Sequence, residues 1–242
     1  MSYKLSDNPG IPINTFILPF VFTDKVVQAV ESIWANHNPA EHRLFLIDNS
    51  GEDYQYKKQL EELSHLYIKA YRNLGPALAF NLGIQIARTD YVTIISDDAR
   101  LIYKDWFKQS IDLIEKDPDS PIVSLGSIYP QSADIGDFYY SSKIYMAEDY
   151  TNYCRKYEMK RDGFGLACAI GKKSTWLLSG LFDESKYIYT IDGTFASKAN
   201  LNGIKTVYNG VVFHYGDASY KGKLVEEGKF HQVGLDKGII QI

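Results

Sequence analysis

The sequence predicts an α/β fold in which helices flank a mostly parallel, doubly wound sheet. Over the first hundred residues, short apolar runs of strand length alternate with segments whose apolar residues recur at helical spacing. The run from Tyr91 to Ile95 is apolar and β-branched at consecutive positions, as in a strand that is covered on both faces of a parallel sheet. This alternation favours parallel βαβ units over separate layers of helices and strands.

The expected elements of the first half follow in chain order. Residues 13–20 predict the first buried strand, and the apolar residues of 24–34 lie at helical spacing. Further strands are expected at 44–47, 66–70 and 91–95, and further helices at 56–63 and 76–87. The helix over 76–87 has Pro76 in its first turn, where the missing N–H costs little.

The second half is less regular. We expect helices at 106–116, 173–179 and 190–202, and strands at 122–125, 165–170, 204–207 and 211–214, with a helical charged tail at 223–231. Residues 127–162 are polar and rich in tyrosine. A long segment of this kind in a compact domain is often functional, with core packing or a dimer contact as the alternative.

Composition narrows the class of protein. The chain has 242 residues, a length that suits one soluble domain. Its net charge of -4 gives no sign of the basic surface that nucleic-acid binding requires. Cys154 and Cys168 have no metal-ligand spacing, so reduced, buried thiols are expected. The sequence shows neither a signal peptide nor a membrane-spanning run, and a cytoplasmic setting is therefore expected.

Two adjacent carboxylates, Asp97 and Asp98, directly follow the strand predicted at 91–95. Ligands of open α/β sheets bind beyond the carboxyl ends of such strands. The two carboxylates repel each other, and a divalent cation, Mn²⁺ or Mg²⁺, held through few protein oxygens and completed by substrate phosphates, would account for the pair. The alternative is a solvated turn, where Asp is common.

The segment RNLGPALAFNLGIQIARTD, together with the acidic motif after it, resembles the family 2 glycosyltransferases of the GT-A fold. Asn73, Gly75, Asn81 and Gly83 occupy the places of the family's turn and small-residue helix, and Ser96-Asp97-Asp98 stands for its metal motif. The resemblance implies one GT-A domain over 1–242. About 1–100 would bind the nucleotide sugar, with Asn73, Gly75 and Asn81 on the donor side. About 101–242 would bind the acceptor, and we expect residues 138–157 to border the acceptor cleft.

The resemblance also implies roles at the ends of the strands. Asp48 would hold the base of the nucleotide, a UDP-sugar being favoured, with Pro19 and Phe20 beside it. Asp97 would contact the ribose or a metal-bound water. Asp98 would ligate the metal that bridges the donor diphosphate, and His214, in the family's valine-x-histidine element, would complete that site. The alternatives are a turn-forming role for Asp48, a core position for Phe20 and a structural role for His214.

Asp192 is the expected catalytic base. The segment from Gly180 to Gly203 resembles the family's Gly-Leu-Phe-Asp-Glu turn and the Glu-Asp pair after it, which here has become Ile191-Asp192. The base takes the proton of the acceptor hydroxyl as its oxygen attacks the anomeric carbon. A helix cap is the alternative role for Asp192, and Asp183 is the next carboxylate to consider.

These residues predict a metal-dependent, inverting transfer of a sugar from a nucleotide-sugar donor to the hydroxyl of a carbohydrate-type or other acceptor. Two other functions stay open. A sugar nucleotidyltransferase would want a Gly-rich loop with Arg or Lys after the first strand, and residues 19–23 have neither. A catalytically degenerate, glycosyltransferase-like binding domain is the second; retention of the acidic residues and His214 argues against it, while Phe20 and Ile191 depart from the family pattern.

Overall fold

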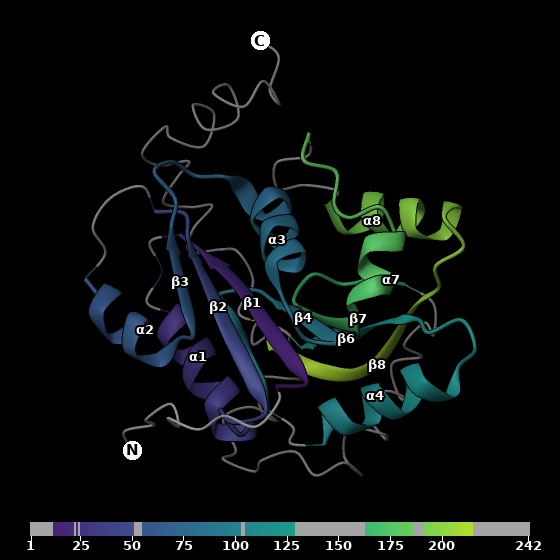
Figure 1. The fold of residues 1–242 in the computed structure, drawn as a ribbon, viewed down its shortest axis with the longest axis horizontal. Helices are drawn as coiled ribbons and strands as arrows, with labels where there is room; N and C mark the ends of the chain where they lie inside the picture. Colours follow the sequence, from purple (N-terminus) through teal and green to yellow (C-terminus); the bar gives the residue numbers. More distant parts are fainter. Residues whose placement is uncertain are drawn as a thin grey trace.

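The computed structural model describes residues 12–21, 23, 25–50, 55–102, 105–128, 163–185 and 191–214. Its strands form one sheet (Figure 1) in the order β3-β2-β1-β4-β7-β6-β8-β5. The strands are β1 Asn14–Phe20, β2 His42–Asp48, β3 Leu66–Lys69, β4 Tyr91–Ile95, β5 Ala99–Arg100, β6 Ile122–Ile128, β7 Cys168–Lys172 and β8 Thr206–His214. The helices are α1 Lys25–Asn36, α2 Lys57–Leu63, α3 Gly75–Ile86, α4 Trp106–Lys116, α7 Lys173–Leu178 and α8 Ile191–Leu201.

The sheet is mostly parallel, as the sequence predicts. β3, β2, β1 and β4 run parallel to one another, and β8 runs parallel to β6. β7 is antiparallel to both of its neighbours, and β5 is antiparallel to β8. The carboxyl ends of β1 and β2 lie level, with Phe20 paired to Asp48, and so they form one edge where ligands of such sheets bind.

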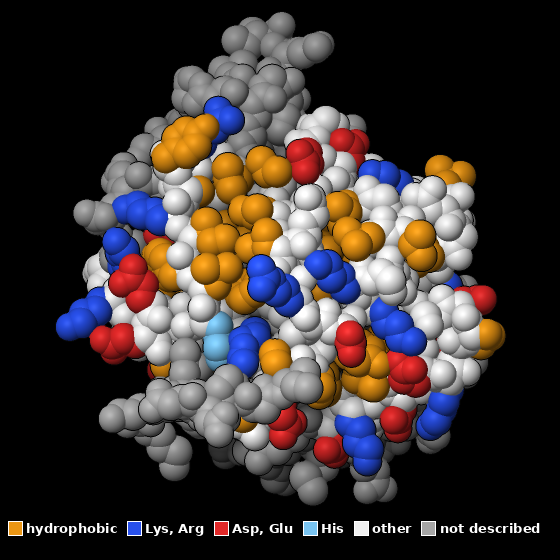
Figure 2. All heavy atoms as spheres, in the orientation of Figure 1, with side chains coloured by type: hydrophobic (Ala, Val, Ile, Leu, Met, Phe, Trp, Pro, Cys, Tyr) orange, Lys and Arg blue, Asp and Glu red, His pale blue; other side chains and the backbone are white. Residues whose placement is uncertain are grey.

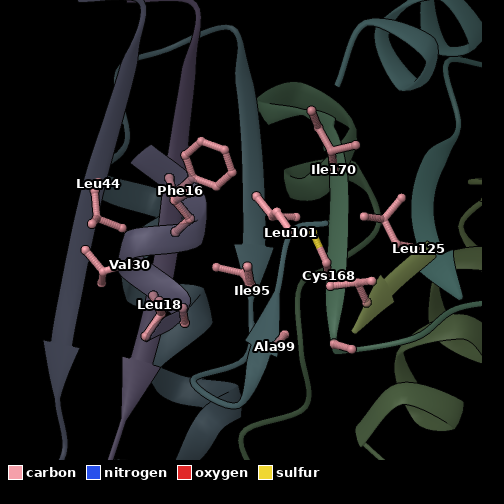
Figure 3. Packing of buried hydrophobic residues seen from close by; sticks show 14 of the residues in the cluster. Phe16, Leu18, Val30, Leu44, Ile95, Ala99, Leu101, Leu125, Cys168 and Ile170 are labelled. Carbon is pink, nitrogen blue, oxygen red and sulfur yellow. The ribbon is translucent and has the colours of Figure 1, made fainter. Parts of the chain in front are cut away.

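Helices cover both faces of the sheet, which confirms the doubly wound arrangement (Figure 1). One apolar layer joins β1 and β2 to α1, α2 and α4; Figure 3 shows Phe16, Leu18, Val30 and Leu44 in this layer. The layer on the opposite face packs α3, α7 and α8 against the sheet through Phe80, Trp176 and Phe195, among others. Cys168 is a free, buried thiol in the first layer, as expected, while Cys154 lies outside the described residues.

Gly83 explains how α3 lies against the sheet. A Cβ atom at this position would be 2.4 Å from Ile17 Cγ2, on the central strand β1. Real Cβ atoms do not approach so closely, so only glycine lets the helix pack at this distance. The small residue that the sequence analysis matched to the family motif therefore brings the second half of α3 close to the middle of β1.

Three features differ from the sequence-based expectation. The two short strands expected at 204–207 and 211–214 are one strand, β8, because Gly210 adopts a φ of +112° and a bulge shifts the register against β6. The two-residue strand β5 was not expected. β7 begins at Cys168 and not at residue 165. The expected tail helix at 223–231 and most of the tyrosine-rich segment, 129–162, lie outside the described residues.

Candidate active site

The acidic motif lies in the turn between β4 and β5. The turn is held to the strand-entry segment before β7, since Ser96 donates its backbone N–H to Ala167 O and its hydroxyl to Leu166 O. The backbone N–H of Val21, just after β1, donates to the Asp97 carboxylate. Burial raises the pKa of Asp97, and the neighbouring Asp98 carboxylate raises it further. The motif is thus fixed at the carboxyl edge of the sheet.

Asp98 and His214 are adjacent in space although the sequence separates them widely. His214 Nε2 lies 3.0 Å from Asp98 Oδ1, and the two side chains are 20% and 14% exposed. The short ladder between β5 and β8 produces this contact, because it pairs Ala99 with His214 and so places the histidine beside the preceding aspartate. The structure therefore brings together the two residues that the sequence analysis named as metal ligands.

This donor pair fits a divalent cation in one particular way. A carboxylate oxygen and an imidazole nitrogen point at the same place, both partly open to solvent. Within the described ranges, no group of three or more His, Cys, Asp or Glu side chains gathers to form a metal cage. A cation held here would therefore take two ligands from these residues and the others from phosphate oxygens and water, as Mg²⁺ and Mn²⁺ sites often do.

Asp48 ends β2 and is fully buried. Its Oδ1 accepts the N–H of Ser50 at 2.9 Å, and its Oδ2 accepts the hydroxyl of Tyr67 at 2.7 Å. The bond from Ser50 corresponds to the turn-forming role, the alternative given in the sequence analysis. The bond from Tyr67 was not predicted, because the sequence indicated only that Tyr67 belongs to a strand. Pro19 and Phe20 are buried at the end of β1. Contact of these three residues with a base stays a prediction.

Asn73 and Gly75 shape the entry to α3. Asn73 Oδ1 accepts the N–H of Gly75 at 2.8 Å, and Gly75 adopts a φ of +74°, which a side chain would strain. Asn49, after β2, accepts the N–H of Leu74 through its side chain. The turn after β3 is thereby tied to the end of β2, beside Asp48, and both residues border the edge expected to receive the donor.

Asn81 has a structural task that the sequence analysis missed. It is buried on α3, where its Oδ1 accepts the N–H of Phe182 at 2.9 Å and its Nδ2 donates to Phe182 O and to Glu184 Oε1. These bonds fasten the turn before α8 to α3. The sequence signal for this task was a lone asparagine on the buried side of an apolar helix. Contact of Asn81 with the donor stays a prediction.

Asp192 lies in the first turn of α8 and is exposed. Its Oδ1 accepts the N–H of Gly193 at 2.8 Å, which agrees with a role at the helix start. Among the described residues, no hydrogen bond or ion pair joins Asp192 to Asp98 or His214. Asp183 accepts bonds from the backbone and hydroxyl of Ser185, as a turn residue does. The role of Asp192 as base stays a prediction.

Comparison with solved structures shows the same fold. A mannosyltransferase from Pyrobaculum calidifontis, solved with GDP-Man and Mn²⁺, superposes with a TM-score of 0.63 at 17% identity, over 100% of this chain and 69% of its own. S. aureus TarS superposes with a TM-score of 0.58 at 13% identity, over 91% of this chain and 38% of its own. A second TarS structure, of residues 1–349, gives a TM-score of 0.57 at 12% identity, over 91% and 63%.

A comparison with curated proteins finds no match. None of the helices in the described ranges has the length and apolar character that a membrane crossing requires. The family model described as Glycosyl transferase family 2 matches residues 17–176, which run from within β1, through the acidic motif, into α7. The chain therefore belongs to glycosyl transferase family 2, and it is a glycosyltransferase with the GT-A fold.

Proposed function

We propose that this protein transfers a sugar from a nucleoside diphosphate donor to an acceptor hydroxyl, with inversion, and that a divalent cation bound by Asp98 and His214 is required. The observation that supports the proposal is the 3.0 Å approach of His214 Nε2 to Asp98 Oδ1. This contact lies just beyond the carboxyl end of the parallel strand β4, the place where ligands of open α/β sheets bind.

Each residue has a stated task in this proposal. Asp98 and His214 hold the cation, which when bound neutralises charge on the leaving diphosphate. Asp97, fixed by the Val21 N–H, contacts the ribose or a water of the cation. Asp192 accepts the proton of the acceptor hydroxyl while the acceptor oxygen bonds to the anomeric carbon and the bond from that carbon to the diphosphate oxygen breaks. Attack from the face opposite the leaving group inverts the anomeric centre.

The chemistry of the site narrows the choice of cation and the choice of nucleobase in the donor. An imidazole nitrogen suits a transition metal better than Mg²⁺, which prefers carboxylate and water oxygens, so we propose Mn²⁺ as the preferred ion. Asp48, with Pro19 and Phe20 beside it, is proposed to receive the base. A carboxylate there requires a base that donates N–H, a condition that uracil and guanine both meet. We favour a UDP-sugar donor, with a carbohydrate-type acceptor; the cytoplasmic setting expected from the sequence stays a prediction.

Calorimetry of UDP and GDP binding, with Mn²⁺ and with a chelator, tests the proposal. We expect binding that depends on Mn²⁺ and that Asp98→Asn or His214→Gln weakens by about 100-fold or more, since even loss of a group that merely orients a ligand costs about 10–100-fold. Asp112→Asn, an exposed carboxylate change on α4 outside the site, is the matched control. Equal affinity in the chelator, or in folded Asp98→Asn, would refute the proposed site.

A further inference from the structure

An apolar patch lies open on the face of the sheet that α3 covers, and we call it the α3/β3 patch. Figure 2 shows apolar side chains gathering over this region. Phe45 pairs with Leu66 and Ile47 with Ile68, and Ile47 and Phe45 pack in the same layer as α3, so all four share its face. The partly exposed members of the patch are Phe45, Leu66, Ile68, Leu78, Leu82 and Ile86.

The two halves of the patch have different origins. On α3, Leu78, Leu82 and Ile86 recur at four-residue spacing, which places them in one stripe along a partly exposed side of the helix. On the sheet, Leu66 and Ile68 belong to β3, the terminal strand, and each is half-buried on this face. Large apolar side chains that gather on a surface commonly mark an interaction site.

Cations border this patch although the whole chain has a net charge of -4. Arg72 is exposed just after the end of β3, and Arg88 is exposed just after α3. Lys173, at the start of α7, donates to the carbonyls that end α3 and adds a third positive charge. Glu184 borders the patch on the α7 side, but its carboxylate accepts a bond from Asn81. The charge of the border therefore differs in sign from that of the chain as a whole.

Tyr71 marks the rim of the patch. It is 81% exposed, and the guanidinium of Arg72 lies 5.4 Å from the centre of its ring. A tyrosine ring with an adjacent arginine suits a boundary where apolar material meets phosphate, because each side chain has an apolar body and a polar end. Tyrosine is enriched at the headgroup level of membranes for the same reason.

We propose that the α3/β3 patch docks on an anionic lipid surface. Apolar side chains flanked by cations match a bilayer whose apolar interior lies beneath negative phosphates. A second copy of the chain is a poorer occupant, because a two-fold contact through the patch would bring the cations of both copies together. The proposal does not depend on the sugar transfer proposed above.

Docking in this way would orient the molecule. Tyr71 and Arg72 follow the carboxyl end of β3, and the backbone N–H of Ala70 bonds to the carbonyl of Asp48 at the end of β2. The edge of the sheet that contains the candidate active site is therefore continuous with the rim of the patch. The consequence is a site that works close to the lipid surface.

Co-sedimentation of the full chain with vesicles tests the proposal. One set contains phosphatidylcholine alone, and the other equal parts of phosphatidylcholine and phosphatidylglycerol. We expect binding to the anionic set, weakened by salt. Because each basic residue near such a surface contributes about fivefold, the double variant Arg72→Gln/Arg88→Gln should lower the partition constant about 30-fold. Tyr71→Ser and Ile86→Ser should also lower it, through lost apolar contact.

Matched controls exist on the same chain. Leu201 is 86% exposed at the end of α8, and Lys116 is exposed on α4, on the other face of the sheet. Leu201→Ser and Lys116→Gln should bind as wild type does. Absence of binding, equal binding to both vesicle sets, or variants that match the controls would overturn the proposal. So would a lipid-free dimer that Tyr71→Ser dissociates, because it would make a second copy the occupant. All these positions are exposed, and unchanged thermal midpoints will show that the variants fold.

Discussion

Replacing His42 by phenylalanine should make the protein more resistant to acid. His42 begins β2 and is 3% exposed, with its ring centre 4.7 Å from that of His37 and 4.8 Å from that of Phe107. Its Nδ1 is buried and finds no hydrogen-bond partner among the described residues. A neutral imidazole in these surroundings gains little from its polar atoms, and protonation would place a charge among aromatic rings.

The size of the effect follows from the pKa of the histidine in each state. Burial lowers the pKa of His42 to about 4, against 6.5 for an ordinary histidine. The unfolded chain therefore binds more protons than the folded one from about pH 6.5 down to about pH 4, and stability falls with pH across that window. At about pH 4.5 the unfolded chain has gained about 2–3 kcal/mol of protonation free energy at this residue, and the folded chain almost none.

Urea unfolding at a series of pH values measures this difference. At pH 7 we expect His42→Phe to lie within about 1 kcal/mol of wild type, since the ring fits an aromatic pocket and loses an unpaired nitrogen. At about pH 4.5 the variant should exceed wild type by about 2–3 kcal/mol. His37, whose pKa burial and His42 lower to about 3, keeps its own acid sensitivity in the variant.

Comparison of variants is needed because other groups titrate in the same window. Burial raises the pKa of Asp97, so protonation of this carboxyl stabilises the folded protein as the pH falls. In the wild-type curve of stability against pH, this effect opposes that of the histidines. His65 supplies a contrast, since its Nδ1 accepts the N–H of Leu44. His65→Phe should lose stability already at pH 7. Parallel pH profiles for wild type and His42→Phe would refute the reasoning.

Three further predictions concern the candidate site and its support. Asp192→Asn should lower sugar transfer by about 10²–10⁴ with donor affinity unchanged in calorimetry, and near wild-type turnover would return Asp183 to consideration. Asn81→Ala should cost about 2–4 kcal/mol in urea unfolding, since it removes three hydrogen bonds, two of them buried; a smaller loss would mean that the turn finds other partners. Gly83→Ala should cost about 1–3 kcal/mol by overpacking Ile17, and an unchanged unfolding curve would contradict the close approach of α3.

Regular elements were the most predictable part of the fold. The strand at 91–95 and the helix at 106–116 agree with β4 and α4, because apolar periodicity and flanking breakers act locally. The two-residue strand β5 has no periodicity to detect, and it forms only because β8 lies beside it. The sequence predicted two strands, at 204–207 and 211–214, whereas in the fold the positive φ of Gly210 forms a bulge within one strand.

The candidate site was predictable where a motif ends a strand. Asp98 and His214 were named from such positions, and the structure places them in contact. The bond from Tyr67 to Asp48 and the bonds from Asn81 to Phe182 and Glu184 were not predictable. They depend on which elements pack together after folding, and nothing local in the sequence specifies those partners. The donor-side role expected for Asn81 stays a prediction, and the fold adds a structural role that the sequence did not reveal.

The two-residue ladder between β5 and β8 has a consequence for the order in which the protein matures. Asp98 leaves the ribosome long before His214, which is the last residue of β8. A nascent chain therefore holds half of the proposed cation site while most of its acceptor half is still unmade. Only when β8 inserts between β6 and β5 does the second half arrive. The chain would then become able to hold the cation at the moment when the sheet is completed. An unfinished or truncated chain could not bind its donor through both Asp98 and His214.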